Sequence, residues 1–510
     1  MLANIDVNQG VSQLDYTSIF KFLAGRFGSC YSNNEYYRHV DYWTQLYKGW
    51  VGSVHTILAQ NGLSSDKRAS RTLNMAKRVA EDWASTIMAD KPVITINGRN
   101  QATSRFVQGA KGNGGVLGTN NFFSQFCDSI ERAFALGTSA VVLGISEVID
   151  NPDMRYKIDL NFYNAISIIP IKYKNNIITD CAFLSSFMSN GKRKYNLSCH
   201  VKNEVGKYVI YNYEAGEDLK FDSYLADNVE GFETNSSEPL FFIIKPQKAN
   251  NVDLDSPLGV SVYNDATDIV IGCDFIYDQI NQDILTGQRI ILMDKSLLGI
   301  DPSGKPIPPQ DFKKWCMQFV GDEGAVDIDK VIKEFSPDLH GEDLCDTLQQ
   351  NLNLLSMRCG LGTNYYNFDK TAGVTATEYV GSQQDLVRNV NINLTNISDI
   401  MTNIVKKIIW VGVNILGYDL LQDAKVIVTI PDGVVTNDAA EKEQDRQDVR
   451  DGIMSKAEYR AKWYGETLED AQQKIDEMNG VQKEDNKDND KTEDVTNPKQ
   501  NTNASEQETT

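Results

Sequence analysis

The longest regular pattern of hydrophobic positions in the chain runs from Val387 to Ile415. Apolar residues recur there at alternating intervals of three and four positions: Val390, Leu394, Ile397, Met401, Ile404, Ile408 and Val411. This spacing predicts an amphipathic helix that buries one narrow stripe. Thr375 and Glu378 provide a capping box for its start, so the helix is expected to run for about 40 residues, roughly 60 Å. Such a length favours a structural spoke, with an ordinary long core helix as the alternative.

A polar and aromatic loop leads directly into this helix. It spans residues 363–373 and carries these side chains: Asn364, Tyr365, Tyr366, Asn367, Phe368 and Lys370. Rings, amides and one cation can make many weak contacts with a passing ligand, but they lack the positive charge that a tight grip on phosphates needs.

Shorter helical patterns lie on both sides of a β-rich region. One helix is expected to open at Ser65 or Asp66, with its buried face listed as Leu73, Ala76, Ala80, Trp83 and Ile87. Another begins near Phe122 and ends at Gly137, which suits the left-handed position after a helix. Further helical stripes are predicted over 266–284 and 344–359, and a charged helical hairpin over 437–478.

Strand patterns occupy much of the first half of the chain. Residues 93–96 and 140–145 each predict a buried strand, and 109–118 is read as a flexible Gly-rich loop. Residues 155–245 are β-rich, with a clear hairpin that turns at 202–206. At the two ends, the first ~28 residues are weakly patterned and are expected to form a mobile arm. Residues 480–510 contain almost no hydrophobic side chains, which predicts a disordered tail.

The charge balance restricts the way in which the protein could meet DNA. The composition is that of a soluble globular protein, with 41% hydrophobic and 24% charged residues, but the net charge is −20. A protein that binds DNA by neutralising phosphates is expected to be basic. Two interpretations remain: no contact with nucleic acid, or a surface that DNA passes without adhering, because acidic walls repel phosphate.

No feature of the sequence predicts secretion or a membrane span. Residues 1–10 have no basic n-region, and the longest apolar run, 136–145, is far shorter than the ~18 residues that a span needs. The eight cysteines are scattered without a C-x-x-C pair, so we expect reduced, mostly buried thiols in a cytoplasmic compartment.

Catalytic and metal-binding motifs are not found in the sequence. The four histidines, His39, His55, His200 and His340, have no second ligand at metal-binding spacing, and no G-x-S-x-G is present. The Gly-rich segment 109–118 lacks the G-K-[ST] ending of a P-loop, and Leu117 stands where a dinucleotide fingerprint needs glycine. We therefore expect no enzyme activity, no cofactor and no metal.

Four blocks, taken in chain order, resemble the portal proteins of tailed bacteriophages. The first is 74–84, NMAKRVAEDWA, with DKP at 90–92, and the second is 122–144, which contains AFALGTSA. The third is 373–378, GVTATE, at the start of the long helix, and the fourth is 452–459, GIMSKAEY. The resemblance covers roughly residues 35–478, and its order and length make it more specific than any single block.

The resemblance implies an α+β portal fold with wing, stem, clip and crown, a long spoke helix, and assembly as a ring. The parts map by order as follows: mobile N-terminal arm 1–29, wing 30–256, stem helix 257–286, clip 287–340, second stem helix 341–361, tunnel loop 362–374, long wing helix and strand 375–432, crown helical hairpin 433–479 and disordered acidic tail 480–510.

The implied function is that of a channel at one capsid vertex, through which double-stranded DNA is packaged and later ejected. The implied partners are other copies of the chain in a ring that is usually dodecameric, the terminase large subunit, a head-completion or adaptor protein, the major capsid and scaffold proteins, and weakly bound DNA in transit, with no membrane. Such a protein belongs to the virion and is assembled in the host cytoplasm. Another oligomeric head component without a DNA channel remains the alternative.

The resemblance also implies which residues face DNA. The tunnel-loop candidates are Asn364, Tyr365, Tyr366, Asn367, Phe368 and Lys370. Asp268, Asp274 and Asp278 of the first stem helix are candidates for the channel lining, although the sequence leaves open whether they face the channel or a neighbouring subunit.

Overall fold

The computed structural model describes residues 16–60, 65–97, 101–109, 114–147, 156–221, 230–287, 290–294, 299–300, 302–303, 306–307, 316–319, 332–335, 338–367, 384–430, 438–464 and 471–477. The chain divides into two compact units, Met1–Val434 and Val435–Thr510. Each unit is considered by itself below. The capping box at Thr375 and Glu378 and the tail 480–510 lie outside the described residues.

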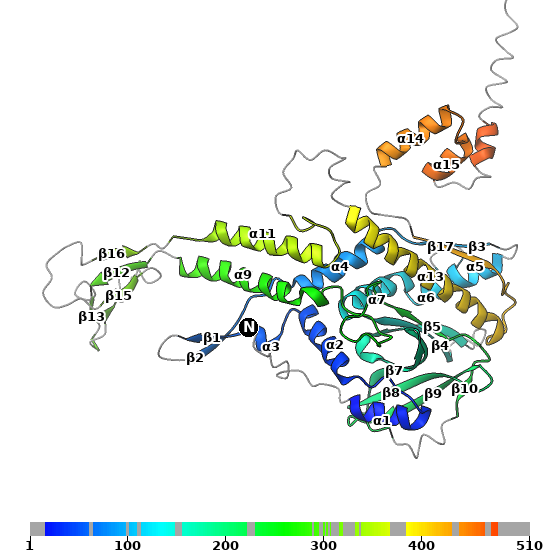
Figure 1. The fold of residues 1–510 in the computed structure, drawn as a ribbon, viewed down its shortest axis with the longest axis horizontal. Helices are drawn as coiled ribbons and strands as arrows, with labels where there is room; N and C mark the ends of the chain where they lie inside the picture. Colours follow the sequence, from blue (N-terminus) through cyan, green and yellow to red (C-terminus); the bar gives the residue numbers. More distant parts are fainter. Residues whose placement is uncertain are drawn as a thin grey trace, which may run out of the picture. The chain divides into compact units, whose positions relative to one another are not determined.

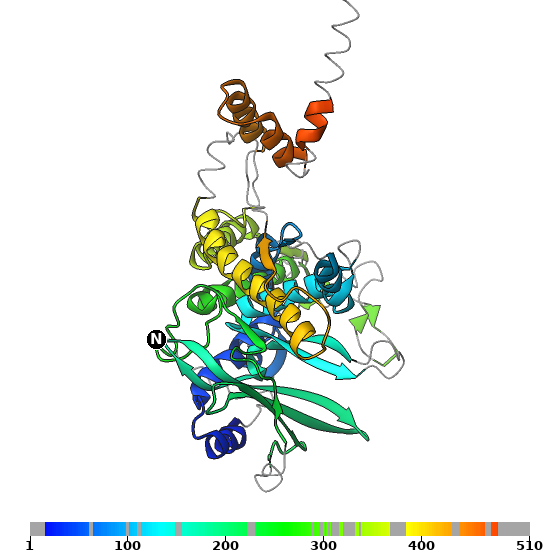
Figure 2. The same ribbon diagram turned by 90° about the vertical axis from the view of Figure 1, so that its right-hand side faces the viewer.

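Two antiparallel sheets, one of five strands and one of three, lie among the helices of the first unit (Figures 1 and 2). The larger has the order β10-β9-β8-β7-β6, with strands Phe232–Glu233, Tyr208–Ala215, Lys192–Lys202, Ile177–Ser189 and Ile168–Lys174. The smaller has the order β11-β4-β5, with strands Phe241–Ile244, Ser139–Glu147 and Tyr156–Asn164. The hairpin expected between 195 and 210 is confirmed as β8 and β9, which pair from Tyr195↔Ala215 to Lys202↔Tyr208.

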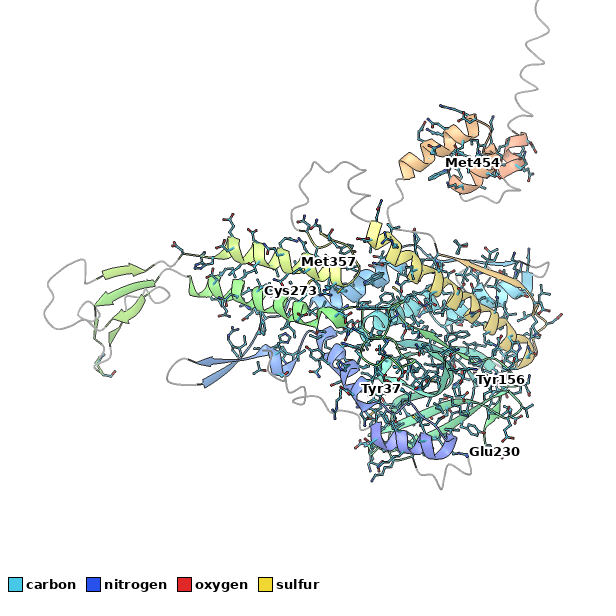
Figure 3. The ribbon with its side chains drawn as sticks, viewed as in Figure 1. Tyr37, Tyr156, Glu230, Cys273, Met357 and Met454 are labelled. Carbon is cyan, nitrogen blue, oxygen red and sulfur yellow. The ribbon has the colours of Figure 1, made fainter. Side chains whose placement is uncertain are left out.

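Helices pack an aromatic core against these sheets. The helices are α1 (Tyr16–Phe27), α2 (Asn34–Tyr47), α3 (Gly52–His55), α4 (Met75–Ile87), α5 (Gln101–Gln108), α6 (Gly115–Thr119) and α7 (Phe122–Leu136). Tyr36 and Trp43 of α2 and Phe126 of α7 are fully buried. The aromatic side chains of these helices therefore belong to the core, where their rings bury large apolar areas. Figure 3 shows this dense packing around Tyr37.

Gly137 makes a close chain crossing possible at the end of α7. Its φ is +87°, as the sequence predicts for the residue after a helix. A Cβ atom at this position would lie 2.6 Å from the carbonyl oxygen of Gly259. The segment that leads towards the next helix therefore passes directly over α7, and Leu258 and Val260 of that segment are buried.

The structure corrects several boundaries expected from the sequence. The mobile arm expected for the first ~28 residues is wrong for Tyr16–Phe27, which form α1. Ile19, Phe20 and Leu23 recur there at helical spacing and are buried. No helix opens at Ser65: β2 (Ser65–Ala69) pairs with β1 (Thr56–Gln60).

Further corrections concern two helix starts and the Gly-rich loop. Asn74 adopts a left-handed φ of 55°, and α4 begins only at Met75. The expected stem helix begins at Thr267 and not at 257, because 258–263 is buried in non-helical contacts. Part of the Gly-rich segment 109–118 also folds, as the short helix α6.

A pair of facing helices follows. They are α9 (Thr267–Thr286) and α11 (Gly341–Arg358), and they lie side by side in Figure 1. Short strands lie between them in the sequence: β12 (Ile290–Asp294), β13 (Gly299–Ile300), β14 (Pro306–Ile307), β15 (Cys316–Phe319) and β16 (Ile332–Phe335). Cys273 of α9 is buried, whereas Met357 of α11 is 49% exposed (Figure 3). The pair is thus only partly covered within one chain.

The long helix predicted near the C-terminal end is present as α13 (Gln384–Asn414). Val390, Ile397 and Ile404 of the predicted stripe are buried, as the alternating spacing required. The strand that follows, β17 (Lys425–Thr429), pairs antiparallel with β3 (Val93–Asn97). This pairing joins two segments that lie more than 300 residues apart in the sequence.

The second unit contains the charged helical hairpin that the sequence predicts. Its helices are α14 (Asp438–Arg450) and α15 (Lys456–Tyr464). The Asp445 carboxylate accepts hydrogen bonds from Lys462 Nζ at 2.6 Å and from Trp463 Nε1 at 2.8 Å, and these contacts join the two helices. The turn around Gly452, where φ is +75°, separates them.

Candidate functional site

Asp274 on α9 lies at the N-terminal end of α4. Its side chain is buried, and Oδ1 accepts hydrogen bonds from the backbone N–H groups of Leu73 at 2.6 Å and Asn74 at 3.1 Å. Helix N-termini leave N–H groups unpaired and favour negative charge, so this carboxylate stabilises the start of α4. Oδ2 also lies 3.2 Å from Nε2 of the buried His55, whose Nδ1 accepts from the Val51 N–H.

Asp278, one turn further along α9, is buried in a paired contact. Its two oxygens accept from Arg68 Nη1 at 3.0 Å and Nη2 at 2.7 Å, and Oδ1 also accepts from the Arg71 backbone N–H at 3.1 Å. The hydrogen bonds from Arg68 lower the pKa of this carboxyl group. Two of the three aspartates expected to line a channel, Asp274 and Asp278, therefore bind the chain's own segment before α4. Asp268 is exposed.

Tyr366 ties the segment after α11 to α4. Its hydroxyl donates to Asp82 Oδ2 at 2.8 Å, and its carbonyl oxygen accepts from Gln349 Nε2 at 2.8 Å. Arg78 Nη2 lies 2.8 Å from the other oxygen of Asp82. Burial, and then the negative charge of Asp82, raises the pKa of the Tyr366 phenol, which keeps it a hydrogen-bond donor. Burial also raises the pKa of Asp82, against the opposing effects of Tyr366 and Arg78.

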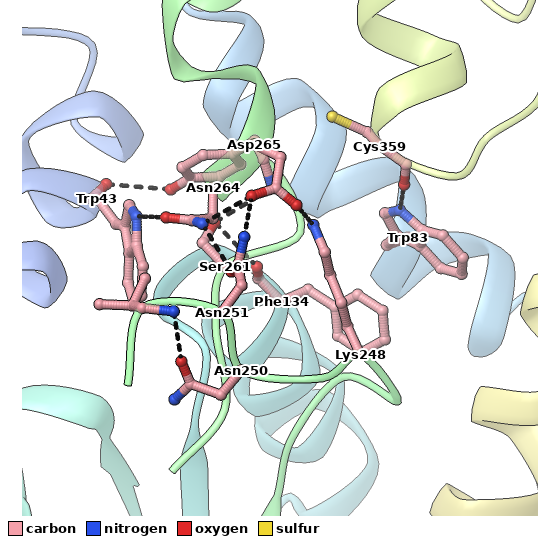
Figure 4. A network of polar contacts seen from close by, with 12 residues as sticks. Trp43, Trp83, Phe134, Lys248, Asn250, Asn251, Ser261, Asn264, Asp265 and Cys359 are labelled. Atoms are coloured by element: carbon pink, nitrogen blue, oxygen red, sulfur yellow. Dashed lines mark hydrogen bonds and ion pairs between the residues drawn. The ribbon is translucent and has the colours of Figure 1, made fainter. Parts of the chain in front are cut away.

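The chain reversal just after α11 is held on two further sides. Trp83 Nε1 donates to the carbonyl oxygen of Cys359 at 3.0 Å (Figure 4), and Asn389 Nδ2 donates to that of Gly360 at 2.9 Å. Gly360 has a φ of +80°, and a Cβ there would lie 3.3 Å from the Trp83 ring. A left-handed turn with little room for a side chain thus joins α11 to the loop.

A polar network lies before the start of α9 and fixes that end of the helix (Figure 4). The Asp265 carboxylate accepts from Lys248 Nζ at 2.7 Å and from Asn251 Nδ2 at 2.6 Å. Asn264 Nδ2 donates to the same carboxylate at 2.9 Å, and its Oδ1 accepts from Trp43 Nε1 at 3.2 Å. The pair of helices is therefore anchored in the first unit at the start of α9 and at the end of α11.

The structure describes four of the six loop candidates. Asn364 is exposed and has a φ of 62°, and Tyr365, Tyr366 and Asn367 are half-buried. The rings of Tyr365 and Tyr366 meet edge to face, with centroids 5.0 Å apart. Phe368 and Lys370 lie outside the described residues.

Sequence reasoning missed the residues that hold this loop in place. They are Asp82, Trp83, Gln349 and Asn389. One of them carried a detectable signal: Asp82 follows Val79 by three positions and stands beside Trp83, on the buried side of α4. A carboxylate on a buried helix face requires a partner. That the partner would be Tyr366 could not be read from the pattern.

Two general features of the described residues bear on function. Within the ranges that the structure describes, no group of three or more His, Cys, Asp or Glu side chains could hold a metal ion. Across those same ranges, no helix combines the length and apolarity that crossing a bilayer requires.

Comparisons with known proteins identify the family. A comparison with curated proteins gives no match. The sequence profile of the family described as phage portal protein, SPP1 Gp6-like, matches residues 30–489, nearly the whole chain. Proteins of this family are structural components of the virion, and their general role is to provide the channel through which DNA is packaged. Because the match spans far more than half of the 510 residues, the chain belongs to the phage portal protein family.

Proposed function

We propose that this portal protein assembles as a ring, with twelve subunits as the expected number, at one vertex of the capsid. Double-stranded DNA enters through the axial channel during packaging and leaves by the same route during ejection. The terminase large subunit docks on the ring and supplies the ATP chemistry, and a head-completion or adaptor protein joins head to tail. Major capsid and scaffold proteins surround the ring during assembly in the host cytoplasm.

The observation that carries this proposal is the α9–α11 pair with short strands between its helices. A chain that leaves a folded body along one helix, forms a small separate sheet and returns along a second helix suits a stem with a clip at its end. The order β15-β12-β16 gives the described part of that small sheet. Several large apolar side chains of this region are exposed in the single chain: Phe275, Ile284, Leu285, Leu339, Leu354 and Met357. Packing against neighbouring copies in a ring would cover such side chains.

The charge distribution supports passage of DNA without tight binding. The net charge of −20 makes adhesion through phosphate neutralisation unfavourable. Because Asp274 and Asp278 are engaged within the chain, we assign the channel-lining role on α9 to Asp268, which is exposed.

The segment after α11 is proposed to contact DNA in the channel. The hydroxyl of Tyr366 already donates to Asp82, so it is not available to DNA. We therefore assign the polar contacts to Asn364, which is exposed, and to Lys370, with Tyr365 and Phe368 offering ring surfaces.

Negative-stain electron microscopy with a mass measurement tests the assembly. Closed rings of about a dozen subunits, with a hole wide enough for a ~20 Å duplex, would support the proposal, since cyclic closure is a strong geometric statement. If the protein forms only monomers or dimers even when co-expressed with a scaffold protein, the ring would be rejected. The alternative structural role in the head, without a DNA channel, would then be favoured.

A further inference from the structure

Helix α4, with the two residues before it, receives contacts from α9 and from the chain that follows α11. At its N-terminal end, Asp274 of α9 accepts from the N–H groups of Leu73 and Asn74. At its C-terminal half, Trp83 donates to the carbonyl of Cys359, directly after α11. One residue earlier, Asp82 accepts from Tyr366 (2.8 Å). Helix α9, the residue directly after α11 and the following loop are thus hydrogen-bonded to α4 or to the two residues just before it.

These contacts are buried, which makes them costly to break. Asp82 is 4% exposed and Trp83 is 3% exposed. A buried carboxylate that loses a hydrogen-bond donor keeps its desolvation penalty without compensation. Arg78 contributes a second partner for Asp82, but its side chain is 57% exposed, so water weakens that pair. The Tyr366 hydroxyl is therefore the main buried donor to this carboxylate.

The backbone of Tyr366 is fixed independently of its side chain. Gln349 on α11 donates to the Tyr366 carbonyl, and Asn389 on α13 donates to the Gly360 carbonyl. Removal of the hydroxyl alone should leave these two contacts in place. The hydroxyl can thus be tested without removal of the turn that carries it.

From this arrangement we infer that Tyr366 is a positioning residue: its hydrogen bond to Asp82 sets the point on α4 at which the DNA-contacting segment is held. The inference rests on the proposed function, because it takes the segment that carries Asn364, Tyr365, Phe368 and Lys370 to meet DNA. The inference goes beyond that function because it names the contact that holds this segment. The segment is fastened to the wing through α4, and the turn after α11 is fastened to the same helix through Trp83, so the loop and the stem share one attachment.

Three full-length variants test the inference in assembled rings. Tyr366→Phe removes only the donor, and Asp82→Asn keeps the shape of the acceptor. Tyr418→Phe is the matched control, since no described residue accepts a hydrogen bond from that hydroxyl. Backbone hydrogen exchange of the peptide 361–367 is measured by mass spectrometry, and packaging of DNA is measured in parallel.

In Tyr366→Phe we expect exchange of this peptide to become about tenfold faster, the factor that corresponds to about 1.4 kcal/mol, with ring size unchanged. Packaging should fall several-fold, whereas Tyr418→Phe should change neither property. A double variant, Asp82→Asn with Tyr366→Phe, should exchange no faster than the more affected single variant, because both changes act on the same contact.

Exchange that stays at the control rate in Tyr366→Phe, or effects of the two substitutions that simply multiply, would overturn the inference. If Asp82→Asn does not fold, the comparison of Tyr366→Phe with Tyr418→Phe still decides it. DNA contact by the loop is tested separately by Lys370→Ser. Normal packaging in that variant would count against the DNA contact, and the exchange result would still report on the anchor.

Discussion

The hydroxyl of Tyr366 lies 2.8 Å from a carboxylate oxygen of Asp82, across 284 residues of chain. This hydrogen bond joins the segment that leaves α11 to a helix that begins at Met75. Burial raises the pKa of the Tyr366 phenol, which therefore stays protonated and donates the hydrogen bond. The contact gives a family block near the N-terminal end a structural role close to the proposed channel loop.

The loop itself can be tested without disturbing that bond. Asn364→Ser with Lys370→Ser should reduce DNA packaging while rings form normally, because both changes remove polar contacts and leave Tyr366 in place. The measurement is the yield of packaged DNA per ring-containing particle. Normal yield in this double variant would reject the assignment of DNA contact to the loop. Replacing Tyr366 in the same experiment would confuse contact with anchoring.

The Arg68–Asp278 pair should hold the β1–β2 segment to α9. Arg68→Ala leaves the buried Asp278 carboxylate without its bidentate partner and should lower the free energy of unfolding by about 1–2 kcal/mol. Urea unfolding monitored by circular dichroism measures the change. The control is Arg388→Ala: Arg388 is 70% exposed and Asp385 is 69% exposed. Surface pairs of this kind contribute little, so an equal loss in both variants would contradict the prediction.

The same pair predicts a dependence of stability on acid. The folded-state pKa of Asp278 lies below its ordinary value of 3.8, mainly through Arg68. The stability it contributes is therefore present above about pH 4 and is lost as the pH falls through the lowered pKa. Thermal melts between pH 7 and pH 3 should show a smaller acid-induced decrease in Arg68→Ala than in the wild type. Identical pH profiles would show that Asp278 does not account for the acid sensitivity.

Buried tyrosines predict a loss of folding stability at high pH. Burial raises the pKa values of Tyr36, Tyr37 and Tyr263 above the ordinary value of 10. Only the unfolded chain ionises these phenols near pH 10, so their contribution to stability is full below that pH and is lost as the pH rises. Absorbance of tyrosinate and far-UV circular dichroism should therefore change together above pH 10. Complete ionisation while the helical signal persists would contradict this burial.

Gly137, at the end of α7, should tolerate substitution poorly. Gly137→Ala adds a Cβ at 2.6 Å from the Gly259 carbonyl and forces alanine into a φ of +87°. The control is Gly191→Ala, where φ is +73° but no atom lies within 4 Å of the added Cβ. The control should lose about 1–2 kcal/mol of unfolding free energy, the backbone cost alone, and Gly137→Ala clearly more. Chemical denaturation of both variants measures the difference, and equal losses would rule out the steric contribution.

Several elements could be predicted from sequence because their patterns are local. The stripe of α13, the hairpin of β8 and β9 and the end of α7 at Gly137 each depend on residues within one or two turns of chain. Burial then follows from periodicity, as Ile397 and Ile404 show. The helix expected from Ser65 was wrong: residues 65–69 pair with residues 56–60 as antiparallel strands, and this backbone pairing outweighed the helical spacing of a few apolar positions.

The sequence by itself determined the α+β composition, the long amphipathic helix, the acidic charge and the likeness to portal proteins. Only the tertiary structure decided what the aspartates and tyrosines do. Asp274 and Asp278 bind the segment before α4, and Tyr366 binds Asp82, because the fold brings together groups that lie some 200 to 284 residues apart. A hydrogen bond or ion pair is specific only within a few ångströms. Periodicity fixes which face of a helix a residue occupies, but the packing of distant elements chooses its partner.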